Sequence, residues 1–151
     1  MNLITAKMQA IKTMATYGLT DWTFKFDDAV QRFGCCDYMN KTISLSRHLV
    51  WLNGANEVKN IILHEIAHAL VGYRHGHDKV WKQKAIAIGC NGNRCYGSEV
   101  KAPTPKWRLE CPTCGRITYR ERKAKTLACG RCCSGKYDAK HSFIWRRHPS
   151  V

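Results

Sequence analysis

The sequence contains no apolar run near the roughly 20 residues that a membrane-spanning helix requires. Its first 17 residues also lack a continuous hydrophobic block and a small-residue cleavage site, and Lys7 and Lys12 interrupt them. A secretory signal peptide is therefore not expected. We expect a protein of the cytoplasm, or one associated with the nucleoid, that neither enters a membrane nor is secreted.

Acidic residues are scarce, with 11 Asp and Glu against 25 Lys and Arg and a formal net charge of +14. Residues 1–100 hold 12 basic and 8 acidic residues, whereas residues 101–151 hold 13 and 3, a net of +10. Four thiolates sharing one Zn²⁺ would lower the second value to about +8. Such a density of positive charge favours a polyanion such as DNA through counterion release. A solubilising surface or an acidic protein partner are the alternatives.

Apolar periodicity divides the first hundred residues into short helices and strands. The expected elements are helices over residues 2–17, 57–71 and 78–88, and strands over residues 22–26 and 41–46. We expect Asn56 to cap the second helix, Glu57 to lie in its first turn and Gly72 to end it. Two prolines then predict a linker over residues 101–106.

Residues 64–68 read His-Glu-Ile-Ala-His, the HExxH pattern, within one of the expected helices. Residues four apart share one helix face, so His64 and His68 can reach one zinc ion from the same side. Glu65 can then act as the general base on a zinc-bound water, the nucleophile of a zinc metallopeptidase. The alternative is a helix whose histidines are only surface or core residues, and the apolar flanks and nearby histidines argue against it.

A catalytic zinc requires a third protein ligand and an open coordination position. The short loop after the HExxH helix contains two candidates, His75 and His77, and spacing does not choose between them. Asp78 and Glu99 are the only acidic residues between this helix and the expected linker. A carboxylate ligand is therefore the poorer option.

The segment HEIAHAL at residues 64–70, followed by HGHDKVW at residues 75–81, resembles the SprT-like (Spartan-like) zinc metallopeptidases. In that family a segment after HExxH supplies the third histidine, and an aromatic residue lies four positions beyond it. Trp81 lies four positions after His77. The resemblance therefore favours His77 as the third ligand, with His75 as the runner-up.

The resemblance extends over approximately residues 3–138, because aromatic and edge strands precede the active-site helix and a four-cysteine ribbon follows it. It implies a zincin-like fold. Members of the family act on DNA–protein crosslinks or under replication stress, so the resemblance also implies substrates that are associated with DNA.

Without an export signal, the nine cysteines indicate metal binding rather than a disulfide framework. Cys111 and Cys114 form one Cys-x-x-Cys pair, and Cys129 and Cys132 form another after fourteen intervening residues. Two such pairs can supply the four thiolates of a tetrahedral structural zinc. A redox-active pair is the competing interpretation, and Cys133 could replace its neighbour as a ligand.

The other cysteines have less obvious roles. Small buried apolar side chains are the simplest interpretation of Cys35, Cys36, Cys90 and Cys95. The last two are close enough in sequence to pair or to add a metal.

Basic and aromatic side chains surround the cysteine pairs. The candidates for contact with nucleic acid are Arg116, Arg120, Arg122, Lys123, Lys125, Arg146 and Arg147. Cations can pair with phosphates, and Trp107, Tyr119 or Trp145 could stack on the bases of a single strand. The alternative is a solvated ribbon whose aromatic residues cover its small core.

Together these patterns predict an α+β fold with one catalytic and one structural Zn²⁺. The expected parts are a zincin-like metallopeptidase domain over residues 1–100, a linker over 101–106, a β zinc ribbon over 107–138 and a basic tail over 139–151. The leading functional hypothesis is an endopeptidase acting on DNA-associated or DNA-crosslinked proteins. The alternatives are a non-catalytic, zinc-containing DNA-binding accessory protein and a general peptidase whose tail binds RNA or acidic protein.

Overall fold

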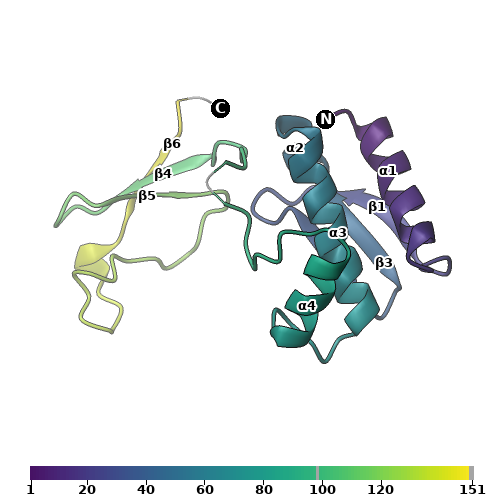
Figure 1. The fold of residues 1–151 in the computed structure, drawn as a ribbon. Coiled ribbons are helices and arrows are strands. Elements are labelled where there is room, and N and C mark those ends of the chain that lie inside the picture. The colour runs from purple at the N-terminus through teal and green to yellow at the C-terminus, as the bar shows by residue number, and fades with distance from the viewer. Residues whose placement is uncertain (98, 150–151) are drawn as a thin grey trace. The chain divides into compact units, whose positions relative to one another are not determined.

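The computed structural model describes residues 1–97 and 99–149, and the chain divides into two compact units, Met1–Pro103 and Thr104–Val151. The first unit contains α1 (Leu3–Thr16), β1 (Thr23–Asp27), β2 (Gly34–Asp37), β3 (Thr42–Ser46), α2 (Arg47–Leu52), α3 (Ala55–Val71) and α4 (Lys79–Ala87). The second contains β4 (Trp107–Glu110), β5 (Ile117–Arg120), the 3₁₀ turn η1 (Ala139–His141) and β6 (Ile144–Arg147). The predicted α+β class is confirmed (Figure 1).

The sheet of the first unit has the strand order β1-β3-β2, with β3 parallel to β1 and antiparallel to β2. All five residues of the central strand β3 are buried. The short strand β2 lies at one edge, so its outer backbone has no strand partner among the described residues. This edge matters for the site, because α3 packs against β2.

Helices α1 and α3 contact each other and both contact the sheet, so the unit has a helical layer over a sheet layer (Figure 1). Small residues of α1, Ala6 and Ala10, are fully buried and allow close approach. Ile62 and Ile66 of α3 join them in the principal hydrophobic core. The helix that carries HExxH is therefore anchored in the core along its length.

The structure alters two local predictions at helix ends. Gly54, rather than Asn56, is the N-cap of α3, because the helix begins at Ala55 and Asn56 already lies within its first turn. Glu57 occupies that first turn, where a carboxylate is favourable, as expected. Gly72 ends the helix with a φ of 84°, a conformation that glycine adopts without strain.

Two elements of the first unit were not expected. Helix α2 begins directly after β3, where the Ser46 hydroxyl accepts a hydrogen bond from the Leu49 backbone N–H. Strand β2 consists of Gly-Cys-Cys-Asp, which has little intrinsic strand preference. It forms because β3 supplies a complete ladder of partners from Gly34↔Leu45 to Asp37↔Thr42.

The second unit is built on an antiparallel sheet with the order β5-β4-β6. Residues 139–151, expected as a basic tail, contribute η1 and β6 to this unit. Leu109 of the central strand is fully buried, as are Cys111 and Cys129 nearby. The apolar core of this unit is therefore small.

No helix in the described ranges is both long and apolar enough to cross a membrane.

Candidate active site and metal centres

Three histidines, two from one helix and one from the loop that follows it, converge on one point. His64 and His68 lie one turn apart on α3, and His77 returns to them through the loop that begins at Gly72. The Nε2 atom of His77 lies 2.9 Å from that of His64 and 3.1 Å from that of His68. The sequence placed the first two on one helix face, and the structure adds His77.

The geometry and chemistry of this cluster fit a zinc ion. Zinc–nitrogen bonds of about 2.05 Å in a tetrahedron place ligand nitrogens roughly 3.3 Å apart, close to the observed spacing. Burial lowers the pKa of His64 to about 3 and that of His68 to about 4. Burial, and then the Arg94 guanidinium, also lower the pKa of His77. Three neutral imidazoles facing one another present the form of histidine that binds metal.

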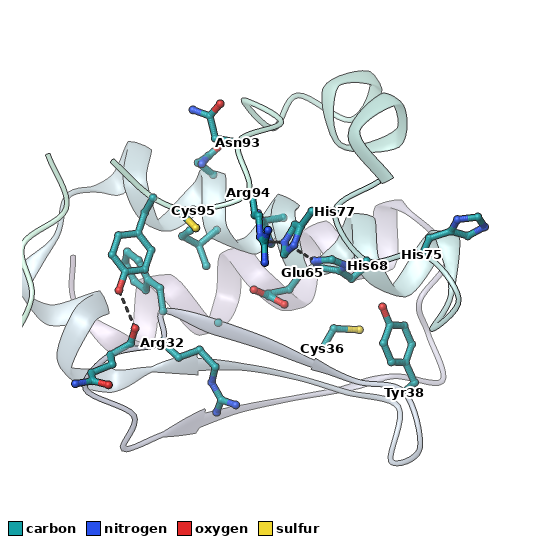
Figure 2. A pocket seen from close by; sticks show the side chains of 18 of the residues that line it. Arg32, Cys36, Tyr38, Glu65, His68, His75, His77, Asn93, Arg94 and Cys95 are labelled. Carbon is teal, nitrogen blue, oxygen red and sulfur yellow. Dashed lines mark hydrogen bonds between the residues drawn. The ribbon is translucent and has the colours of Figure 1, made fainter. Parts of the chain in front are cut away.

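His75 does not join this cluster. Its Nδ1 lies 2.8 Å from an Asp78 carboxylate oxygen, and its ring points away from the other histidines (Figure 2). Asp78 has a second contact, because it accepts a hydrogen bond from the Trp81 backbone N–H and so caps α4. The cap that starts α4 therefore also holds His75 apart.

Trp81 supports the three imidazoles from behind. Its side chain is only 1% exposed, and its ring centroid lies 4.7 Å from that of His64, 5.1 Å from His68 and 4.6 Å from His77. The His68 ring is stacked on it at an interplanar angle of 25°. One buried indole thus limits the orientations of all three rings.

Glu65 is buried beside the histidines, with 6% of its surface exposed. Burial raises its pKa to about 8, and the Arg32 guanidinium partly opposes that shift. Arg32 is itself held by Asp27 at 2.7 Å. The carboxyl group projects from α3 into the cavity (Figure 2).

Gly34, at the start of β2, is required by the position of Glu65. A Cβ atom at residue 34 would lie 2.5 Å from Glu65 Oε1 and 2.7 Å from its Cγ. These separations are shorter than side chains tolerate, so only glycine lets the strand approach this carboxylate. Nothing in the local sequence indicated that Gly34 faces Glu65.

The open side of the site is a cavity of about 750 Å³, within the range of small-molecule and peptide sites. One wall is formed by β2 and the residue that follows it, through Cys36 and Tyr38. The segment after α4 contributes the opposite wall, including Arg94, which lies beside His77 in Figure 2.

Two hydrogen bonds hold the segment that carries Arg94. The Asn91 backbone N–H donates to Asn60 Oδ1 at 2.9 Å, and the Tyr96 hydroxyl donates to the Gln31 carbonyl at 2.8 Å. Arg94 lies between these anchors and adds a fixed positive charge to the cavity. Nothing in the local sequence indicated this position, because the two hydrogen bonds join residues that are 31 and 65 positions apart in the sequence.

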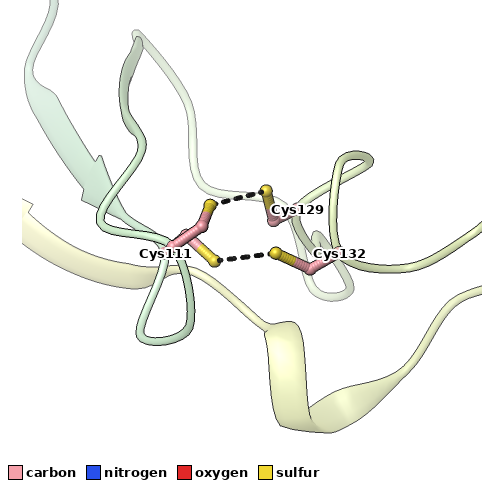
Figure 3. Close-up of side chains that lie close together, drawn as sticks. Cys111, Cys129 and Cys132 are labelled. Atoms are coloured by element: carbon pink, nitrogen blue, oxygen red, sulfur yellow. Dashed lines mark hydrogen bonds between the residues drawn. The ribbon is translucent and has the colours of Figure 1, made fainter.

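The four predicted cysteines also come together, in the second unit (Figure 3). The sulfur atoms of Cys111 and Cys132 are 3.9 Å apart, and those of Cys114 and Cys129 are 3.7 Å apart. Zinc–sulfur bonds of about 2.3 Å in a tetrahedron place sulfurs roughly 3.8 Å apart. The cluster is consistent with a zinc ribbon.

The backbone of the first Cys-x-x-Cys pair favours the thiolate form of Cys111. Burial opposes ionisation, but N–H groups of Cys114 and Thr113 donate to the sulfur and lower its pKa to about 6. Cys133, the possible substitute ligand, lies outside the cluster, with its thiol 4.0 Å from the Asp138 carbonyl.

The remaining cysteines lie in the first unit. Cys90 is buried, as expected for a small apolar side chain, whereas Cys95 is exposed and lines the cavity. Cys35 and Cys36 are partly buried in β2, and burial raises the pKa of both thiols.

All seven basic residues proposed for nucleic-acid contact are exposed, but they do not form one patch. Arg120 and Arg147 lie directly opposite Trp107 on neighbouring strands, and Lys123 Nζ lies 4.1 Å from the Trp107 ring centroid. Arg146 lies on the other sheet face. Arg116, Arg122 and Lys125 lie in loops.

The aromatic candidates are likewise divided between the two faces of this sheet. Tyr119 and Arg146 both lie opposite Arg108. Trp145 lies on the face of Trp107, with ring centroids 6.4 Å apart.

Comparison with known proteins adds a family to this geometry. A search of curated proteins returned no match. The model of the SprT-like family matches residues 5–103, which include the helix with His64, Glu65 and His68 and the loop with His77. That match covers more than half of the sequence, and the chain therefore belongs to the SprT-like family.

Proposed function

We propose that this chain is a zinc-dependent endopeptidase in which Glu65 is the general base and His64, His68 and His77 hold the metal. Membership of the SprT-like family supports a metallopeptidase-type role. The observation that carries the proposal is a buried carboxyl group beside three converging imidazoles, at the wall of an open cavity.

The residues of the site have separate tasks in this proposal. A zinc ion held by the imidazoles would acidify a water molecule and polarise the scissile carbonyl. Glu65 takes the proton from the attacking water and passes it to the leaving amine. Its carboxylate stays in place because Gly34 leaves room for it. Trp81 keeps the imidazoles aligned.

The unpaired edge of β2 supports a peptide as substrate. Gly34 and Cys36 of this strand line the cavity, and an edge strand can bind an extended peptide through backbone hydrogen bonds. A chain lying along this edge would pass over Glu65. Such a site accepts an internal segment of a protein, as an endopeptidase requires.

We further propose that the substrates are proteins bound or crosslinked to DNA. The charge of the second unit supports this, because residues 104–151 carry 12 basic and 3 acidic residues. Arg120, Lys123 and Arg147 around Trp107 provide cations next to an aromatic ring. The phosphates of DNA can pair with these cations, and the bases of a single strand can also stack on the ring.

Replacing Glu65 tests the catalytic part. Glu65→Gln keeps the size of the side chain but removes the base, so cleavage of an unfolded protein should fall by about 10²–10⁴-fold while zinc content is unchanged. Glu57→Gln, in the first turn of the same helix, is the matched control and should keep full activity. Full activity of Glu65→Gln would refute Glu65 as the base.

Cleavage of a DNA-binding protein with and without single-stranded DNA tests the substrate class. Stimulation by DNA supports the proposal. A cleavage rate that is the same with and without DNA favours a general peptidase. DNA binding without any cleavage favours an accessory protein.

Truncation tests where DNA binds. A truncated chain should extend to Pro103, because the Asn53 side chain bonds the backbone N–H and carbonyl of Lys101. We expect the truncated protein to lose most of its DNA affinity, and the full chain to lose affinity steeply with added salt. Equal binding by both would show that the second unit is not the DNA-binding element.

A further inference from the structure

A second hollow adjoins the active-site cavity and is not used by the proposed chemistry. It has a volume of about 640 Å³ and shares Cys36, Tyr38 and Tyr73 with the wall of the catalytic cavity. Met39 also lines it. The two hollows therefore adjoin each other at these three side chains.

The turn between β2 and β3 presents Met39 at the rim of the hollow. Asp37 accepts hydrogen bonds from the Asn40 backbone N–H at 3.1 Å and from its side-chain amide at 2.8 Å. Lys41 completes the turn with a φ of 44°. The side chain of Met39 at the apex of this built turn is 95% exposed, although it is apolar.

Two tyrosines complete the walls. Tyr73, in the loop after α3, is 72% exposed, and the Arg74 guanidinium carbon lies 5.8 Å from its ring centroid. Tyr38 is partly buried, and its ring lies edge-to-face with that of Trp22, with the centroids 6.4 Å apart. Both aromatic rings are thus held by neighbours while they still line the hollow.

We propose that Tyr38, Met39 and Tyr73 form a substrate subsite that takes a large apolar side chain, aliphatic or aromatic, from the peptide bound in the catalytic cavity. This inference rests on the proposed peptidase function. It assigns the hollow to the substrate because the hollow adjoins the catalytic cavity and shares three lining residues with it.

The walls of the hollow favour apolar side chains, because Asp37 is the one charged residue among the described residues that line it. Both carboxylate oxygens of Asp37 are engaged by Asn40. Methionine adapts its shape and makes favourable contacts with aromatic rings, so the subsite accepts several large apolar residues.

Peptide binding to the inactive chain tests the subsite apart from catalysis. The full-length, zinc-loaded Glu65→Gln protein is titrated with fluorescent octapeptides of Ser and Ala that carry Phe, Leu or Ser at one central position. We expect Phe and Leu peptides to bind about tenfold more tightly than the Ser peptide, the lower end of discrimination by an apolar pocket.

Variants of the rim identify the residues responsible. Met39→Asp and Tyr73→Ser, each in the Glu65→Gln background, should remove most of the tenfold preference. The matched control is Met8→Asp, because Met8 is also an exposed methionine, at 68%, but lies on α1 away from the hollow. The control should keep the preference.

The outcomes separate the subsite from the proposed function. Equal affinity for Phe and Ser peptides, or a preference that survives in both rim variants, would overturn the subsite. Cleavage sites of wild-type protein on unfolded casein provide a second readout, and sites without enrichment of apolar residues would also overturn it. If the peptides bind with the expected preference but wild-type protein cleaves nothing, the peptidase function fails and the apolar subsite stands.

Discussion

The two candidate metal centres differ in how much protein structure surrounds them. His64 and His68 project from a helix whose residues Val58, Ile62 and Ile66 are buried in the main core, and Trp81 packs beneath the two histidines. The cysteine cluster lies in a unit where Leu109 is the only buried apolar residue besides cysteine among the described residues. We therefore expect the first unit to fold before it binds metal and the second to need metal to fold.

The contrast also separates the chemistry of the two centres. Four sulfurs close the coordination sphere of the cluster in the second unit, as in structural zinc sites. Three imidazoles leave a position open in the first unit, next to a buried carboxyl group and a cavity. The difference supports a structural role for the cysteine site and the catalytic role that we propose for the histidine site.

The largest effect should follow loss of a cysteine ligand. We expect two zinc ions per chain in wild-type protein by elemental analysis, and Cys111→Ser should lose one of them. Because structural zinc sites contribute about 10–16 kcal/mol to folding, residues 107–147 should unfold while the first unit stays folded. NMR spectra of labelled protein would show this. Cys133→Ser should retain both metals, and one zinc per wild-type chain would contradict the two-site interpretation.

Removal of Trp81 should weaken the first unit without unfolding the second. Trp81→Ala deletes a fully buried indole, so unfolding of this unit should cost about 3–5 kcal/mol less, and zinc should bind more weakly there because the imidazoles lose their support. Denaturation curves and metal titration measure the two effects. Val80→Ala, at an exposed neighbouring position, is the control. An unchanged zinc affinity would show that the indole does not orient the ligands.

Gly34→Ala should affect catalysis more than stability. The added methyl group must displace the Glu65 carboxylate, and a shift of about 1 Å in a catalytic group can reduce the rate by about 10²-fold. The stability cost of overpacking is about 1–3 kcal/mol. The measurements are kcat, zinc content and thermal unfolding, with Cys35→Ala as the control on the same strand. Wild-type kcat in the alanine variant would contradict the steric argument.

The smallest effect should come from His75. His75→Ala removes a surface contact with Asp78, and such pairs are worth about 0–1 kcal/mol. Zinc content and cleavage should stay at wild-type levels. His77→Ala, by contrast, removes a ligand itself. Loss of a residue that only supports a ligand reduces metal affinity by about 10–100-fold, so the loss of zinc affinity in His77→Ala should be larger. A larger loss of metal in the His75 variant would reverse the assignment of the third ligand.

Local spacing was sufficient to predict part of each centre. Four residues along a helix place His64 and His68 on one face, and a Cys-x-x-Cys turn places two sulfurs together, whatever the rest of the chain does. The main helices and two of the strands also followed from apolar periodicity, because their apolar residues recur on one face. These features depend only on neighbours in the sequence.

Tertiary structure decided the features that depend on distant residues. Strand β2 forms because β3 pairs with it. Strand β6 belongs to the sheet of the second unit because β4 pairs with β6. Spacing did not choose between His75 and His77 as the third metal ligand. In the structure, the residue that caps α4 bonds to His75 and keeps it apart from the other histidines. Gly34 and Arg94 showed no sequence signal, since their roles arise from how closely a strand and a loop approach α3 and its histidines. The spacing of residues along the sequence determines short-range geometry. Burial, and the approach of segments that are distant in the sequence, are determined only by packing.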